Sequence, residues 1–242
     1  MNVLSLFAGI GGLELGLERA GITVVGQVEI DPWCRRVLAK HWPDVPRHDD
    51  VRTAAEWWQS EERPNIDLVA GGPPCQPFSG AGRSSGASDD RNGWPWFLDV
   101  VRTVRPRYVI AENADELLSP RFHQEFSEIL VTLADLGFAV EWDVVSACAL
   151  GAPHPRRRLF LVAYPDSEHG KARLGTGTGR ALQGIDRNQG AWSDRIIGSL
   201  ETSRSDDRET DGSARRMVEA GGNAVVPAVG ESIGRLLMAL AA

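Results

Sequence analysis

A cysteine on a stiff loop is the first group in this sequence that could form a covalent bond with a substrate. Cys75 stands in the run GGPPCQPFSG, between prolines and directly after the strand-like residues 67–70. Proline fixes the backbone and removes N–H donors, so the loop would hold a thiolate in one place, and positioning supplies much of covalent catalysis. For a cysteine considered alone, a structural residue in a Pro-rich turn is the simpler interpretation.

A carboxyl group and two guanidinium groups could assist such a nucleophile. Glu112 and Asn113 end a second apolar run, RYVIAE, and a carboxyl group there could donate a proton to a ring nitrogen if burial raised its pKa. Arg156 and Arg158 are two positions apart at the entrance to a strand, so their side chains share one face. They could bind a phosphate, a base carbonyl or the carboxylate. The simpler alternatives are an exposed strand-end acid and a solvated basic turn.

A glycine-rich segment near the start of the chain predicts a nucleotide site. FAGIGG lies between an expected strand and an expected helix. Glycines there let a ligand approach the backbone, and the helix N-terminus offers N–H groups that can bind it. The dinucleotide pattern G-x-G-x-x-G is only partly matched, because Glu14 occupies its last glycine position. Glu29, after the next strand, could bind ribose hydroxyls, and Asp50 with Val51 could bind adenine. Together they indicate an adenosine-containing cofactor, the alternative being a tight turn with ordinary surface acids.

The elements that must position these residues alternate between strands and helices. Such alternation predicts an α/β fold with a mostly parallel sheet covered by helices on both faces. The last two strands are expected to be neighbours. The expected strands are residues 2–7, 24–30, 67–71, 107–112, 140–149 and 158–163. The expected helices begin near residues 12, 32, 97, 122 and 227.

Composition excludes several classes of protein. The 242 residues are 42% hydrophobic, enough for a core, and contain no apolar run of the roughly 18 residues that a membrane span needs. The start of the chain does not resemble a signal peptide. Cys34, Cys75 and Cys148 show no CxxC spacing, so we expect no disulfide framework, no metal site and a cytoplasmic location. A net charge of -7 argues against a protein that coats nucleic acid, although a local basic cleft remains compatible with it.

The composition changes near Pro165. Residues 165–216 are polar and poor in apolar side chains, so we expect a loop, a linker or a disordered segment. The predicted catalytic domain therefore consists of residues 1–164 and 217–242, with a terminal helix that packs back onto it.

The motifs, in their order, resemble those of the cytosine-5 DNA methyltransferase family. LSLFAGIGG, VEID, GGPPCQPFS, AENA, GAPHPRRRLFLVA and GGNAVVPAVGESIG each resemble a family motif, over residues 2–163 and 221–235. Ala114 and His154 depart from the usual valine and glutamine. The resemblance implies a Rossmann-like fold that uses S-adenosylmethionine, and a short polar segment where the family usually has a target-recognition domain.

The resemblance also implies a role for each matching residue. Cys75 would attack carbon 6 of a cytosine swung out of the duplex, Glu112 would contact N3 and the exocyclic amine, Arg158 would hold O2 and Arg156 would support the loop. Gln76, Ser79 and Asn113 would contact the DNA or the flipped base. The cofactor would be surrounded by Phe7, Ala8, Gly9, Ile10, Gly11, Gly12, Glu29, Ile30, Asp50, Val51, Pro73, Trp96, Asn223 and Val225.

The expected partner is double-stranded DNA and the expected state is a monomer. A restriction endonuclease or a separate recognition partner is left open by the sequence, as is the DNA sequence that would be read. Three alternatives also stay open: the same chemistry on RNA, a nucleotide-binding accessory protein without catalysis, and a nicotinamide oxidoreductase.

Overall fold

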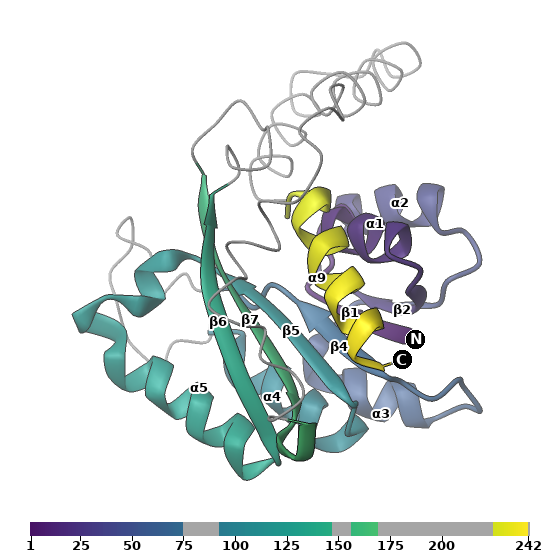
Figure 1. Ribbon diagram of the computed structural model, residues 1–242. Coiled ribbons are helices and arrows are strands. Elements are labelled where there is room, and N and C mark those ends of the chain that lie inside the picture. Colours follow the sequence, from purple (N-terminus) through teal and green to yellow (C-terminus); the bar gives the residue numbers. More distant parts are fainter. Residues whose placement is uncertain (75–91, 147–155, 169–224, 242) are drawn as a thin grey trace.

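In the part of the chain that the structure describes, seven strands form one sheet in the order β3-β2-β1-β4-β5-β7-β6 (Figure 1). The structure is a computed structural model, and it describes residues 1–74, 92–146, 156–168 and 225–241. Strands β1 to β5 run parallel, and β7 is antiparallel to both β5 and β6. The strands are β1 (Asn2–Leu6), β2 (Thr23–Val28), β3 (Arg47–His48), β4 (Leu68–Gly71), β5 (Tyr108–Asn113), β6 (Phe138–Ser146) and β7 (Arg157–Pro165).

Helices cover both faces of this sheet. Figure 1 shows α1, α2 and α9 on one face, and α3, α4 and α5 on the other. The helices are α1 (Gly12–Arg19), α2 (Pro32–His41), α3 (Ala54–Gln59), α4 (Trp94–Val104), α5 (His123–Asp135) and α9 (Pro227–Ala241), with short 3-10 turns at Val51–Thr53, Asp115–Leu118, Pro120–Phe122 and Asp166–Glu168. The predicted α/β class with a mostly parallel, two-sided sheet is confirmed. None of the described helices is long and apolar enough to cross a bilayer.

The central strands are apolar throughout because both of their faces are buried. In β4 every residue is buried, and the same holds for β5. Leu4 and Val69 are register partners that face α4, whereas Val3 and Leu68 pair beside them and face α1. Burial on both faces explains why these strands are continuously hydrophobic. A strand with one face in solvent would alternate apolar and polar residues.

The predicted elements agree with the structure to within a few residues. The largest shift is at α4, which begins at Trp94 rather than at the predicted residue 97. Pro95 lies in its first turn, where a missing N–H costs no hydrogen bond, so the helix includes the proline. The predicted end of β6 falls on residues 147–149, outside the described residues. The assignment of residues 165–216 to a separate polar segment stays a prediction, since most of that range also lies outside them.

Glycines allow α9 to lie directly against α1. A Cβ atom on Gly12 would overlap the carbonyl oxygen of Val225, and one on Gly16 would overlap that of Pro227. On the other helix, a Cβ atom on Gly234 would come within 2.7 Å of the Ala20 Cβ. The contact brings Val225, far away in the sequence, next to the loop that follows β1.

Candidate active site

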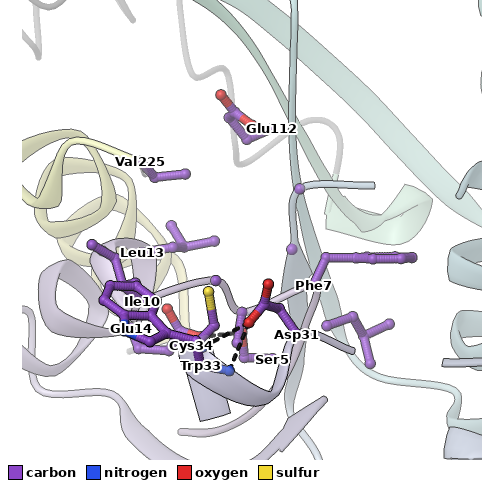
Figure 2. A pocket seen from close by; sticks show the side chains of 16 residues that line it. Ser5, Phe7, Ile10, Leu13, Glu14, Asp31, Trp33, Cys34, Glu112 and Val225 are labelled. Atoms are coloured by element: carbon purple, nitrogen blue, oxygen red, sulfur yellow. Dashed lines mark hydrogen bonds between the residues drawn. The ribbon is translucent and has the colours of Figure 1, made fainter. Parts of the chain in front are cut away.

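A cavity of about 330 Å³ lies at the carboxyl ends of the parallel strands, where ligands bind in open α/β sheets (Figure 2). Its wall combines the β1–α1 loop, the start of α2, the end of β4, the end of β5 and Val225, two residues before α9 begins. The lining residues are Ser5, Leu6, Phe7, Ala8, Gly9, Ile10, Gly12, Leu13, Glu14, Asp31, Trp33, Cys34, Gly71, Gly72, Glu112 and Val225.

The β1–α1 loop has a backbone that few residue types adopt. Phe7, Gly9 and Gly11 have φ angles of 54°, 56° and 91°, in the left-handed region. For a bulky residue such as Phe7 this conformation costs on the order of 1–3 kcal/mol, and strain of this kind concentrates at functional sites. Gly11 caps α1 without a side-chain hydrogen bond. The N–H groups of the first helical turn therefore face the cavity end without intrahelical partners.

Glu29 stabilises the β1–α1 loop through hydrogen bonds to the backbone. Its Oε2 accepts a hydrogen bond from the Gly9 N–H at 2.7 Å, and its Oε1 accepts one from the Asp31 N–H at 2.8 Å. The side chain is 9% exposed and is not among the residues that line the cavity. In this structure Glu29 joins the loops after β1 and β2, and its contact with a ribose stays a prediction.

Several other predicted cofactor residues lie away from the cavity wall. Asp50 caps the turn Val51–Thr53 and forms a 2.6 Å ion pair with Arg52, whose hydrogen bonds lower the pKa of the Asp50 carboxyl to about 2. Ile30 is 71% exposed and Trp96 is 41% exposed. None of the following predicted residues lines the described cavity: Gly11, Ile30, Asp50, Val51, Pro73 and Trp96.

Nine wall residues were not predicted as site residues: Ser5, Leu6, Leu13, Glu14, Asp31, Trp33, Cys34, Gly71 and Gly72. Asp31 caps α2, its Oδ1 accepting from the N–H groups of Trp33 at 2.6 Å and Cys34 at 3.2 Å. The signal that could have found Asp31 is its place just before Pro32 at a helix start. Burial, followed by the charges of Glu29 and Asp31, raises the pKa of the Cys34 thiol to about 12, so this cysteine stays a thiol at neutral pH.

Glu112 and Arg158 form an ion pair at the opposite end of the cavity. Nε of Arg158 lies 2.9 Å from Oε1 of Glu112, whose side chain comes from β5 while Arg158 comes from the neighbouring β7. Burial raises the pKa of the Glu112 carboxyl, and the charges of Arg158 and Arg156 oppose this rise. A Cβ atom on Gly72 would come within 3.0 Å of Oε2, so glycine lets the chain after β4 pass close to the carboxyl group.

Asn113 holds the beginning of the cysteine loop. Its Nδ2 donates to the Pro73 carbonyl oxygen at 3.1 Å, its Oδ1 accepts from the Ala114 N–H at 2.9 Å, and the side chain is 2% exposed. The Gly93 N–H donates to the Pro74 carbonyl oxygen at 3.2 Å, so the two described ends of the loop meet. The structure thus shows Asn113 as a buried anchor, and its contact with DNA stays a prediction.

Four predicted site residues lie outside the described residues: Cys75, Gln76, Ser79 and Asn223. Arg156 is described, and its pKa is lowered by burial and by the charge of Arg158. The structure therefore brings together the glycine loop, Val225 and Glu112 around one cavity, with Arg158 behind Glu112.

Among the residues described, no cluster of His, Cys, Asp and Glu could hold a metal ion.

Comparison with known proteins gives one consistent family. Residues 1–184 match the family described as C-5 cytosine-specific DNA methylase. The chain is 37% identical over 161 residues to the Type II methyltransferase M.NgoMIV of Neisseria gonorrhoeae, covering 66% of this chain and 50% of that protein. It is 35% identical over 168 residues to the Type II methyltransferase M2.BsuMI of Bacillus subtilis, covering 67% and 42%. This chain thus spans about half the length of the curated relatives that it matches.

A solved structure of similar length has the same fold. It is the crystal structure of a prophage-encoded E. coli protein described as a DNA modification methyltransferase. The TM-score is 0.71 and the alignment covers 100% of this chain and 99% of the other, at 20% sequence identity. At that identity the likeness supports the fold alone, which is the Rossmann-like fold of the methyltransferases.

Proposed function

Since this chain belongs to the C-5 cytosine-specific DNA methylase family, we propose that it methylates carbon 5 of cytosine in DNA through a covalent bond to Cys75, with S-adenosylmethionine as the methyl donor. The observation that carries the proposal is the ion pair between buried Glu112 and partly exposed Arg158, since Glu112 shares one cavity with the glycine loop after β1. A methyl donor and a pyrimidine could meet there.

The residues present fit an adenosyl amino acid. The cavity volume of about 330 Å³ lies within the range of small-molecule sites. Gly12 lines it at the start of α1, where a larger residue would overlap Val225, and left-handed Gly9 leaves space on the cavity side. Bound S-adenosylmethionine would supply an electrophilic methyl group. Phe7, Gly9, Gly12 and Val225 would form its walls.

Glu112 can act on the base because burial favours its protonated form. An ordinary glutamic acid is ionised at neutral pH and would repel the lone pair of cytosine N3. Burial raises the pKa of Glu112, so its carboxyl takes up a proton more readily than an ordinary glutamic acid and would donate a hydrogen bond to N3 in that form. Arg158, which lies beside Glu112, would hold the oxygen at carbon 2 of the same ring.

The proposed role of Cys75 follows from the electronics of the ring. The thiolate adds to carbon 6, and the pair of electrons displaced from the 5,6 double bond makes carbon 5 nucleophilic while Glu112 disperses charge at N3. Carbon 5 then takes the methyl group as its bond to the sulfonium sulfur of the donor breaks, which would leave a neutral thioether. A base removes the carbon-5 proton, and the thiolate leaves as the double bond reforms. The cytosine must leave the duplex stack for its ring to be reached.

Trapping on modified DNA tests this proposal. A 5-fluorocytosine in place of the target cytosine blocks the final elimination, so wild-type protein with S-adenosylmethionine should form a denaturation-resistant complex with DNA. Cys75→Ser should form none, and Cys148→Ser should trap as the wild type does. Equal trapping by Cys75→Ser would show that another group is the nucleophile.

The substrate and its recognition are tested separately. Transfer of labelled methyl groups should be found with double-stranded DNA and not with tRNA; transfer to tRNA alone would overturn DNA as the substrate. Bisulfite sequencing of DNA from expressing cells would then read out the target sequence. The relatives named above are Type II methyltransferases, which makes a companion endonuclease or recognition protein part of this proposal.

A further inference from the structure

Glu14 is a buried carboxyl group at the cavity that the proposed chemistry does not use. It lies in the first turn of α1 with a side chain that is 0% exposed, yet it lines the cavity. Its Oε1 accepts a hydrogen bond from the Ser5 hydroxyl at 2.5 Å. Among the described residues its Oε2 has no hydrogen-bond partner. A carboxylate oxygen buried in this way normally has a donor, because an unsatisfied one costs the desolvation free energy of the group.

The surroundings of Glu14 supply no positive charge. Within the described ranges it forms no ion pair with lysine or arginine, unlike Glu112 with Arg158. Burial raises its pKa to about 7, and the charges of Glu29 and Glu18 add to the rise. Gln27, the register partner of Ser5, is also fully buried and has no hydrogen-bond partner for either side-chain atom. None of the described residues that line this cavity is positively charged, and Oε2 of Glu14 is left without a donor.

We propose that Glu14 recognises the ammonium group of the amino-acid end of S-adenosylmethionine. The inference rests on the function proposed above. Of the two cationic groups on this cofactor, only the ammonium carries hydrogens that it can donate to a carboxylate. The sulfonium has none, and the adenosine part has no cation.

The geometry of α1 makes this end complementary to an amino-acid zwitterion. The helix N-terminus favours a negative charge, and Gly12 in its first turn lines the cavity. Glu14 lies two residues further along the same turn and favours a positive charge. Figure 2 shows Glu14 and Ser5 at the end of the cavity opposite Glu112, so an amino-acid group held there would leave the other end for a base.

Binding of two adenosyl ligands to one variant tests the inference. Glu14→Gln keeps the shape of the side chain and removes its charge. S-adenosylhomocysteine carries the amino-acid end, whereas 5′-methylthioadenosine lacks it and keeps the adenosine. By titration calorimetry at pH 8, the affinity of Glu14→Gln for S-adenosylhomocysteine should fall about tenfold to a hundredfold, as for a lost hydrogen bond to a charged group. Its affinity for 5′-methylthioadenosine should stay within about twofold of the wild-type value.

Glu18→Gln is the matched control. It makes the same change one turn further along α1, where Glu18 accepts a hydrogen bond from the Trp42 indole rather than lining the cavity. This variant should bind both ligands as the wild type does. Equal loss of both ligands in Glu14→Gln, or no loss of either, would overturn the role of Glu14. Failure of the wild-type protein to bind either ligand would instead overturn the proposed function.

Discussion

Two buried carboxyl groups face the same cavity from opposite ends, and they differ in what lies beside them. Glu14 comes from α1, and its described partners are the Ser5 hydroxyl and its own backbone N–H; Glu112 comes from β5 and is paired with Arg158. Burial is the largest cause of the raised pKa in both. Only Glu112 has nearby guanidinium groups that oppose the rise.

The difference shows how one residue type can serve two tasks in one site. When environments separate the protonation behaviour of two carboxyl groups, they also separate their roles. In the proposed function Glu112, which has a cation beside it in the protein, acts on a neutral ring. In the proposed recognition of the cofactor, Glu14 receives its positive charge from the ligand.

The largest expected effect is the loss of methyl transfer when Glu112 is replaced, with cofactor binding unchanged. Glu112→Gln should lower the rate of methyl transfer by about a hundredfold to ten-thousandfold, the usual contribution of a general acid. Its affinity for S-adenosylhomocysteine should stay close to the wild-type value, because the amino-acid end lies at the other side of the cavity. Glu116→Gln, an exposed acid in the turn after β5, is the control and should retain full activity. Full activity in Glu112→Gln would remove the basis for distinguishing the two carboxyl groups.

A smaller effect concerns stability. The folded-state pKa of Glu14 is raised from 4.5 to about 7, so the folded protein binds a proton that the unfolded chain releases between those values. The free energy of unfolding therefore falls as the pH rises from 4.5 to 7, by about 3 kcal/mol at 1.36 kcal/mol per unit. Glu14→Gln lacks this group, so its stability relative to the wild type should rise by up to about 3 kcal/mol between pH 4.5 and pH 8.

Urea unfolding of both proteins without ligand at the two pH values measures this difference. A stability difference between Glu14→Gln and the wild type that is the same at both pH values would contradict this prediction.

The smallest expected effect is on the pH dependence of binding. An ammonium group pairs with the ionised form of Glu14, which makes up about a tenth of the molecules one unit below a pKa of about 7. The affinity for S-adenosylhomocysteine should therefore rise about tenfold from pH 6 to pH 8 and then level off. Glu18 on the same helix and Glu29 after β2 act on this carboxyl group, while Asp31 and Cys34 on α2 and Glu112 on β5 face the same cavity.

Calorimetry across this pH range checks that prediction. Glu14→Gln should lose the dependence, and 5′-methylthioadenosine should not show it with either protein. A dependence that persists in Glu14→Gln would assign the titration to one of the other groups.

Much of the fold was predictable because its signals are local. The runs that became β4 and β5 are apolar on both faces, and Pro32 marked the start of α2. The glycine loop, Glu112 and Val225 were predicted as site residues, and the structure places them around one cavity. Glu14 was noticed only as a departure from a glycine pattern, since nothing in its local sequence indicates that Ser5 of β1 lies beside it in the interior.

The sequence by itself determined the order of strands and helices, and the chemical groups that follow the carboxyl ends of the strands. Hydrophobic runs, glycines and prolines act over a few residues, so they can be recognised along the chain. Only the tertiary structure decided which carboxyl group received an arginine and which did not, and which predicted residues, such as Glu29, support the wall rather than line it. Burial and charge pairing depend on segments that are distant in the chain and adjacent in space, and these set the pKa of each acid.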